Sequence, residues 1–323
     1  MTLGLGLPNA QFRKYFQREL KAVRDLGPDN LLIIAYHDDD KEYDRITQEA
    51  ELCRDLGITA PLVRVYRPTV RGLNPVVCAA EDARLFQLYL GAGLTPGWIP
   101  WNEMNIEGWG EDWSAQIEYA KAYLSAFTEI VAADNLELGV EVHLPALSPI
   151  GDYEDSWYAY RDAGLGDRFD FADVHCYEMD DLQDADTLGA IVGLPVVCTE
   201  VNQMLPSIYA PALARNGCDE SYWFILSSDD PAFYQYSLLR NPDLYEDFKA
   251  TAQQKEEPMP EFVLGFKVLA ERLRADGHTV LAFSDEISID HASLQRVMID
   301  SEPNLFAWQD GQESVVVYPY PLA

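Results

Sequence analysis

The sequence predicts an α/β protein, a (β/α)8 TIM barrel followed by a short β-rich segment. Short apolar runs alternate with longer segments of helical period from residue 2 to residue 277, an alternation typical of βα units and a parallel sheet. Eight apolar runs can be counted, and eight parallel strands are the number that closes a βα barrel. We therefore expect one barrel domain over residues 1–277.

The expected strands are the eight short apolar runs. They cover residues 2–7, 31–36, 62–66, 98–101, 138–143, 171–176, 195–199 and 222–226. Apolar residues between them recur at helical spacing, and such a stripe faces the core. One helix face holds Ile117, Ala120, Leu124, Phe127 and Val131, and another holds Phe262, Phe266, Leu269 and Leu273. Asp112 is placed to cap the first of these helices.

A doubly wound open sheet is the alternative fold. Such a sheet usually carries a glycine-rich phosphate loop after its first strand. Here Gly4 and Gly6 lie inside the first apolar run and Pro8 follows, with no third glycine placed to begin a helix. The sequence therefore favours the barrel, gives little support to a nucleotide site and predicts no cofactor.

Two C-terminal segments differ from the repeating pattern. Residues 229–260 are polar, and we expect an irregular excursion there between the eighth strand and the last helix. Beyond residue 277, β-like runs at 279–283, 305–308 and 314–318 surround an expected turn at Asp310 and Gly311. Because 46 residues are few for an independent core, we expect residues 278–323 to form a β appendage packed on the barrel.

The charge balance restricts the partners. The formal net charge is −31, from 54 acidic and 23 basic residues. Nucleic acid and anionic membrane surfaces need basic patches, so neither is an expected partner, and a polyanionic substrate is disfavoured. Only seven of the basic residues are lysines. Adaptation to high salt and a simple solubility surface explain this composition equally well, and the oligomeric state is left open.

The cysteines and the N-terminal residues indicate in which cellular compartment the protein is expected. Five cysteines at wide spacing, without a C-x-x-C pair, predict reduced core residues instead of disulfides or metal ligands. No run reaches the ~18 apolar residues of a membrane span, and the first residues lack the basic and apolar regions of a signal peptide. The sequence as given predicts a cytoplasmic protein, or a secreted one if a leader precedes it.

Two acidic residues stand at the ends of apolar runs. Glu103 follows the fourth run in the stretch GWIPWNEMN, and Glu200 follows the seventh in PVVCTEVN. In a closed βα barrel the active site lies at the C-terminal ends of the strands, so both carboxylates are expected at the same face. The pattern predicts a site built on paired acids.

These acids and their neighbours resemble a known group of enzymes. Asn102 precedes Glu103, His175-x-Tyr177 ends the sixth run, and Trp223 lies on the eighth. The combination is similar to the retaining glycosidases of clan A, a superfamily of (β/α)8 glycoside hydrolases. The pattern around Glu103 is closest to the xylosidase and iduronidase branch.

The resemblance implies a role for each of these residues. Glu103 would be the acid/base and Glu200 the nucleophile in the cleavage of a neutral, β-linked sugar through a covalent glycosyl-enzyme. Asn102 would bind the sugar 2-hydroxyl. Apolar or anionic neighbours are expected to raise the pKa of Glu103. Residues 1–277 would then be the catalytic domain, with an oligosaccharide, a polysaccharide or a small glycoside as its partner.

Glu200 must stay ionised to attack, so it needs hydrogen-bond donors. Tyr177 is the first candidate, and an arginine on the third run, Arg64 or Arg67, is the second. His175 is expected either at the floor of the site or as a buried polar residue of the core.

Further residues in the same layer are candidates for contact with the sugar. Trp109 and Trp223 are possible stacking platforms, because the C–H faces of sugars pack on aromatic rings. His37 and His143 end the second and fifth runs, and packing explains each of them at least as well. The run Asp38 to Asp40 would bind sugar hydroxyls or Ca²⁺, although a solvated loop is favoured.

Two other functions remain open. One is a carbohydrate-binding barrel that has lost turnover, although the presence of both glutamates argues against it. The other is a hydrolase whose metal is held by His37, Asp38 and His175, for which the sequence offers no compact ligand spacing. We therefore expect no metal.

Overall fold

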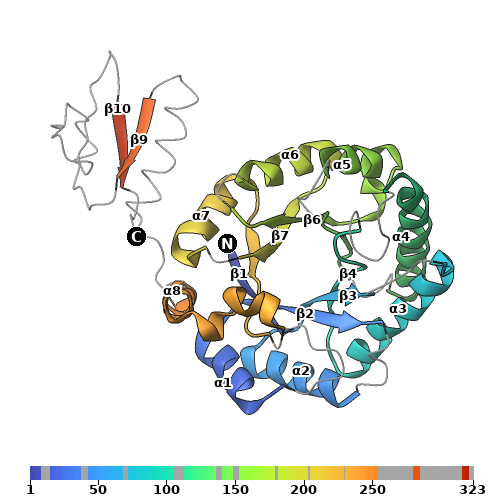
Figure 1. The fold of residues 1–323 in the computed structure, drawn as a ribbon, viewed down its shortest axis with the longest axis horizontal. Helices are drawn as coiled ribbons and strands as arrows, with labels where there is room; N and C mark the ends of the chain where they lie inside the picture. The colour runs from blue at the N-terminus through green and yellow to red at the C-terminus, as the bar shows by residue number, and fades with distance from the viewer. Residues whose placement is uncertain are drawn as a thin grey trace. The chain divides into compact units, whose positions relative to one another are not determined.

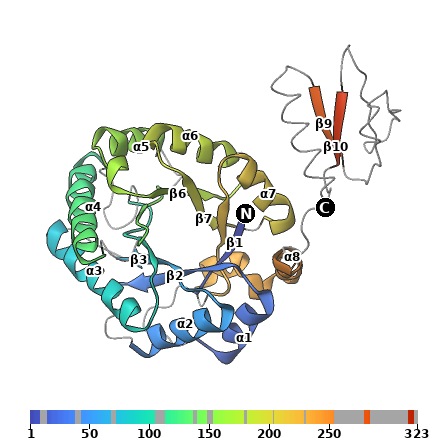
Figure 2. The ribbon, with the colours of Figure 1, turned by 180° about the vertical axis from the view of Figure 1, so that it is seen from behind.

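The computed structural model describes residues 1–8, 15–37, 43–67, 72–104, 113–135, 140–147, 153–178, 181–202, 204–228, 230–253, 279–283 and 315–319. The chain divides into two compact units, Met1–Ala252 and Gln253–Ala323. In the first unit a ring of parallel strands is surrounded by helices (Figures 1 and 2). This arrangement confirms the predicted (β/α)8 barrel.

The barrel strands follow one another in chain order around the ring. They are β1 Thr2–Gly6, β2 Asn30–Tyr36, β3 Leu62–Tyr66, β4 Gly97–Ile99, β5 His143–Leu144, β6 Phe171–Cys176, β7 Val196–Val201 and β8 Glu220–Trp223. β1 pairs with both β2 and β8. The ring closes between β4 and β5, where Trp98 and Val142 form a parallel bridge. All the strands therefore end at the same face.

The helices pack outside the strands. They are α1 Gln17–Leu26, α2 Tyr43–Leu56, α3 Pro75–Gly91, α4 Trp113–Asn135, α5 Tyr153–Asp162, α6 Leu182–Val192, α7 Pro206–Arg215 and α8 Pro242–Gln253, with short 3₁₀ helices η2 Gly166–Arg168, η4 Pro231–Tyr236 and η5 Leu238–Arg240. Four of the five residues expected on one face of α4 are buried: Ala120, Leu124, Phe127 and Val131. Within the described ranges, no helix is long and apolar enough to span a membrane.

Apolar residues fill both the space between strands and helices and the interior of the barrel. The interior cluster contains Leu32, Leu62, Ile99, Val197 and Tyr222. Gly4 on β1 makes room for this cluster, because a Cβ at that position would collide with the Tyr222 ring. All five cysteines are free and buried, as the sequence predicts.

The segment after β8 corrects one expectation. We predicted an irregular excursion over residues 229–260, but this segment contains η4, η5 and the regular helix α8. Leu244 and Phe248 lie one helical turn apart on α8 and are fully buried. Acidic and other polar residues around this short apolar pair hide its helical period in the sequence. The expected helix near residues 262–273 and the cap at Asp112 lie outside the described residues.

In the second unit, β9 Thr279–Phe283 and β10 Val315–Pro319 are described. They pair in parallel, with Val315 opposite Thr279. Two parallel strands cannot be joined by a tight hairpin turn. The predicted run at 305–308 and the turn at Asp310 and Gly311 lie outside the described residues. The domain boundary at residue 277 and the packing of residues 278–323 on the barrel stay predictions.

Candidate active site

Glu200 points into the barrel because β7 contains a bulge. Val174 on β6 pairs with Cys198, but the next residue, His175, pairs with Glu200, so β7 has one extra residue at this point. The register between β7 and β8 shifts in the same place. In a regular strand, with Val197 inside, Glu200 would face the helices. The bulge turns its carboxylate to the interior, where it is 6% exposed.

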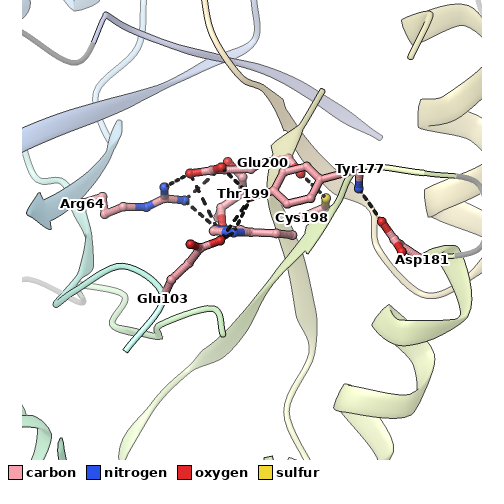
Figure 3. A network of polar contacts seen from close by, with 8 residues as sticks. Arg64, Glu103, Tyr177, Asp181, Cys198, Thr199 and Glu200 are labelled. Carbon is pink, nitrogen blue, oxygen red and sulfur yellow. Dashed lines mark hydrogen bonds and ion pairs between the residues drawn. The ribbon is translucent and has the colours of Figure 1, made fainter. Parts of the chain in front are cut away.

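Two side chains donate hydrogen bonds to the Glu200 carboxylate. Arg64 on β3 donates from Nη1 to Oε1, and the Tyr177 hydroxyl donates to Oε2 over 2.9 Å. Figure 3 shows Arg64 and Glu200 pointing toward each other across the barrel mouth. The charge of Glu200 raises the pKa of Arg64 against the opposing effect of burial. The two donors hold the two oxygens of the Glu200 carboxylate in a fixed orientation.

The other arginine proposed for this role has different partners. Arg67, at the end of β3, donates to Asp82 on α3 over 2.6 Å and to Glu81 over 3.2 Å. In strand β3, Leu62 and Arg64 share the inward face, so Arg67 falls outside that alternation. Of the two candidates, Arg64 is therefore the arginine beside Glu200.

Glu103 lies across the mouth from Glu200 and is 9% exposed. Its backbone φ is 35°, in the left-handed region that side-chain-bearing residues seldom adopt. Such a conformation costs ~1–3 kcal/mol and is concentrated at functional sites. The Oε1 atom lies 2.9 Å from His175 Nδ1 and accepts a hydrogen bond from the Tyr177 hydroxyl over 3.2 Å.

The Tyr177 hydroxyl bridges the two glutamates, and this limits their separation. Its oxygen is 3.2 Å from Glu103 Oε1 and 2.9 Å from Glu200 Oε2, so these two atoms are at most about 6.1 Å apart. Retaining glycosidases place their carboxyl groups ~5–5.5 Å apart, whereas inverting enzymes need ~6.5–9.5 Å to admit a water. The bridge is compatible with the retaining spacing.

The pKa of Glu103 corrects a second expectation. Burial raises this pKa, but the hydrogen bond from His175 and the nearby positive charge of Arg64 outweigh burial and hold the pKa below its usual range. We expected apolar or anionic neighbours to raise the pKa. Arg64 and His175 are far from Glu103 in the sequence, and only the closed barrel brings their strands beside it.

Tyr177 is held in place by a residue that sequence reasoning missed. Its backbone N–H donates to Asp181 Oδ2 over 2.7 Å (Figure 3). The N–H of Glu178 donates to the same oxygen over 2.9 Å. Burial and the charges of Glu200 and Glu103 raise the pKa of Tyr177. Its hydroxyl therefore stays protonated and able to donate. In the sequence, Asp181 only looks like a residue preceding helix α6.

His143 is not at the face where the strands end, which corrects a third expectation. We placed it at the end of the fifth run, but it begins β5 and pairs with Phe171 at the start of β6. It is 1% exposed, and its Nδ1 lies 2.8 Å from Asp173 Oδ1. His143 therefore lies deep in the barrel, where it cannot contact a substrate.

Trp223 does not face the mouth either. Tyr222 takes the inward position on β8, so its neighbour Trp223 points toward the helices. The Trp223 ring packs edge-on against Phe248 of α8, Nε1 donates to the Met204 carbonyl over 2.7 Å, and the residue is 0% exposed. It cannot serve as a sugar platform. The next inward position belongs to Phe224.

The remaining candidates are less closely joined to the glutamates. Asn102 is buried beside Glu103 at the end of β4. His37 follows β2 and donates its backbone N–H to the Tyr66 carbonyl over 3.3 Å, and no contact in the described part of the chain joins it to either glutamate. Trp109 and the run Asp38 to Asp40 lie outside the described residues. Across the described ranges, no group of three or more His, Cys, Asp or Glu residues is placed to hold a metal ion.

The hydrogen bond from Tyr177 gives a first test of the site. We expect Tyr177→Phe to lower kcat/KM by about 10- to 100-fold, because a hydrogen bond to a charged group contributes ~1.5–3 kcal/mol. Tyr245→Phe is the matched control, since it removes a hydroxyl–carboxylate bond of 2.9 Å to Asp25 on the outside of the barrel. Steady-state kinetics of both variants checks this. If Tyr177→Phe were as active as Tyr245→Phe, the Tyr177 hydroxyl would have no role in the site.

The sequence matches no protein-family model and no curated protein. Solved structures with the same fold do match. ZgEngAGH5_4 in complex with a cellotriose has 12% identity and a TM-score of 0.55, covering 78% of this chain and 95% of that one. The mannotriose complex of Thermomonospora fusca β-mannanase has 12% identity and a TM-score of 0.51, covering 74% and 82%. The catalytic domain of GH30 xylanase C from Talaromyces cellulolyticus has 10% identity and a TM-score of 0.50, covering 78% and 75%.

These neighbours are (β/α)8 barrels of GH5 and GH30, families of clan A, the group that the sequence motifs resemble. At such low identity the likeness shows the fold. None of the neighbours singles out the xylosidase and iduronidase branch.

Proposed function

We propose that this protein is a retaining glycoside hydrolase that cleaves a neutral, β-linked sugar through a covalent glycosyl-enzyme. The observation that carries the proposal is the Tyr177 hydroxyl, which contacts carboxylate oxygens of both Glu103 and Glu200. Two acids this close at the ends of barrel strands fit a double displacement. The sugar complexes and enzyme names of the structural neighbours support the same class of substrate.

In this proposal Glu200 is the nucleophile. Arg64 and Tyr177 donate to its two oxygens, which fixes the orientation of the carboxylate for attack on the anomeric carbon. The bond from the anomeric carbon to the leaving oxygen breaks as the bond to a Glu200 oxygen forms. A water then cleaves the glycosyl ester with a second inversion, so the net configuration is retained.

Glu103 is the acid/base. It gives a proton to the leaving oxygen in the first step and takes a proton from water in the second. His175 holds the Glu103 carboxylate in place, with its Nδ1 2.9 Å from Oε1. Asn102, next to Glu103, donates a hydrogen bond to the sugar 2-hydroxyl, a contact that strengthens in the transition state.

Turnover of a panel of aryl β-glycosides tests the proposal. We expect hydrolysis of at least one member with a neutral sugar, and we expect activity to survive a chelator because both steps use side chains alone. Binding of oligosaccharides without any turnover would instead indicate a carbohydrate-binding barrel. Loss of activity with the chelator would indicate a metal-dependent hydrolase.

The lowered pKa of Glu103 predicts the pH dependence. A proton donor is active only when protonated, and protonated Glu103 is lost as the pH rises through its lowered pKa. The pH profile of kcat/KM reports the free enzyme. For an oligosaccharide, we therefore expect kcat/KM to fall with rising pH from the acid range onward. For a 2,4-dinitrophenyl glycoside, whose leaving group needs no proton, this fall should be absent. A parallel fall for both substrates would assign it to another group.

A further inference from the structure

One apolar cluster belongs neither to the main core nor to the barrel interior. It contains Tyr36, Phe224, Ile34 and Ile225, with Tyr66, Phe233 and Tyr236 packed against it and partly exposed. We use the name aromatic wall for its five rings: Tyr36, Tyr66, Phe224, Phe233 and Tyr236. Three of these rings end or follow the barrel strands β2, β3 and β8, and the other two come from η4.

Strand alternation places the aromatic wall at the barrel mouth. Tyr66 is two residues beyond Arg64 on β3, and Phe224 is two residues beyond Tyr222 on β8, so each continues the inward face of its strand. The backbone N–H of Phe224 donates to the carbonyl of Val201, the residue after Glu200, over 2.8 Å. The wall therefore begins directly beside the proposed nucleophile.

The two η4 rings are held against the strand ends. The N–H of Ile225 donates to the Tyr236 carbonyl over 3.2 Å. Phe233 and Tyr236 lie 5.8 Å and 6.4 Å from the Phe224 ring, measured between centroids. Tyr36 and Tyr66 meet edge to face at 5.3 Å. Phe224 and Phe233 also meet edge to face, and the Tyr236 ring is tilted by 50° against both of them.

Partly exposed aromatic rings beside a pair of carboxylates suit one class of ligand. A pyranose has apolar C–H faces and hydroxyl edges, so its face can pack on a ring while its edges meet polar groups. The two arginines at this end of β3 are engaged by Glu200 and by Asp82 with Glu81. This favours a neutral sugar over an anionic one.

The position of the aromatic wall relative to Glu103 and Glu200 indicates which side of the cleaved bond the wall would contact. Glu103 must reach the leaving oxygen, so the leaving group lies toward β4. Phe224 and the η4 rings stand next to Glu200, on the β8 side of the mouth. We propose that the aromatic wall is a glycone subsite, with Phe233 and Tyr236 packing against the neutral sugar unit that precedes the cleaved one. This inference rests on the proposed glycosidase function.

Comparing one and two glycone units tests the subsite. The substrates are 4-nitrophenyl β-glycosides of glucose, mannose and xylose, and those of cellobiose, mannobiose and xylobiose. For the disaccharide glycosides that the wild type cleaves, we expect Phe233→Ala and Tyr236→Ala each to lower kcat/KM about tenfold. The corresponding monosaccharide glycosides should change far less, because they do not reach the η4 rings. Thermal melting verifies that each variant is folded. If only one of the two variants folds, its kinetics alone are sufficient for the test.

Tyr234→Ala is the matched control in the same 3₁₀ helix. The Tyr234 ring packs under the Arg240 guanidinium, 3.6 Å from its central carbon, and is not part of the aromatic wall. We expect this variant to keep wild-type kinetics on both kinds of substrate. Equal losses on monosaccharide and disaccharide glycosides, no loss on either, or a similar loss in Tyr234→Ala would overturn the subsite.

A second readout separates this inference from the proposed function. If the wild type cleaves none of the glycosides, the glycosidase proposal is wrong, and binding then tests the wall. Saturation-transfer NMR with cellotriose, mannotriose and xylotriose should show contact with the wild type and with Tyr234→Ala, and lose it in Phe233→Ala and Tyr236→Ala. No contact with the wild type, or undiminished contact with both wall variants, would contradict the subsite.

Discussion

Glu200→Ala should lower turnover of every substrate by roughly 10⁴- to 10⁶-fold, the size of loss seen when a nucleophile is removed. The substitution deletes the atom that attacks the anomeric carbon and leaves a space below the sugar. Added azide should enter this space and displace the leaving group directly. Its product, a glycosyl azide, should therefore have inverted configuration, which NMR of the anomeric proton measures.

The fold of this variant needs a check, because Glu200 holds Arg64 and Tyr177. Glu200→Gln keeps the shape of the side chain and should be equally inactive. Glu118→Ala is the control for loss of a surface carboxylate, since Glu118 pairs with Lys121 on the outside of α4. It should keep full activity. Substantial turnover by Glu200→Gln, with no contaminating wild type, would show that Glu200 is not the nucleophile.

Glu103→Ala should separate substrates by their leaving groups. A 2,4-dinitrophenyl group departs without a proton, so this substrate should still form the glycosyl-enzyme, which then accumulates because no base activates water. An oligosaccharide, whose leaving group needs the proton, should lose ~10²–10⁴-fold in kcat/KM, the usual contribution of general acid catalysis. A pre-steady-state burst of dinitrophenol measures the accumulation.

Azide gives the second measurement on Glu103→Ala. It should attack the accumulated glycosyl-enzyme in place of water and release a glycosyl azide of retained configuration. The opposite configurations expected from the two variants assign the two roles independently. A reversed pattern would mean that Glu200 is the acid/base and Glu103 the nucleophile. Normal turnover by both variants would mean that neither glutamate takes part in the reaction.

The sequence predicts the barrel well because the signal repeats. Each strand run is short and apolar, and the eight runs agree with one another even where a boundary shifts by a few residues. The position of Glu103 at the end of β4 follows from the same regularity. Glu200 is different. Its inward orientation depends on a bulge, and the apolar run 195–199 contains no mark of one.

Side-chain direction is the part that the sequence predicts least well. Trp223 and Phe224 are adjacent aromatic residues, and only the register of β8 decides which of them faces the mouth. His143 was misplaced because the fifth strand begins where we expected it to end. Arg64 and Arg67 differ in their place in the strand alternation, and only the structure shows that Arg64 has the inward place, beside Glu200.

The lowered pKa of Glu103 is a second property that the sequence alone does not predict. Its causes are His175 on β6 and Arg64 on β3, which are 72 and 39 positions away in the chain. Coulombic interactions fall off with distance in space. A carboxylate's neighbours in sequence therefore say little about its pKa until the fold is known.

The covalent intermediate is the central claim, and trapping it is the most direct test. A 2-deoxy-2-fluoro glycoside with a good leaving group, built on the best sugar of the panel, slows the second step and preserves the ester. Mass spectrometry of the peptic digest should then find one fluoroglycosyl group on the peptide that contains Glu200, and none in Glu200→Gln. A label on a different carboxylate, or turnover of the parent glycoside to a product of inverted configuration, would contradict the account.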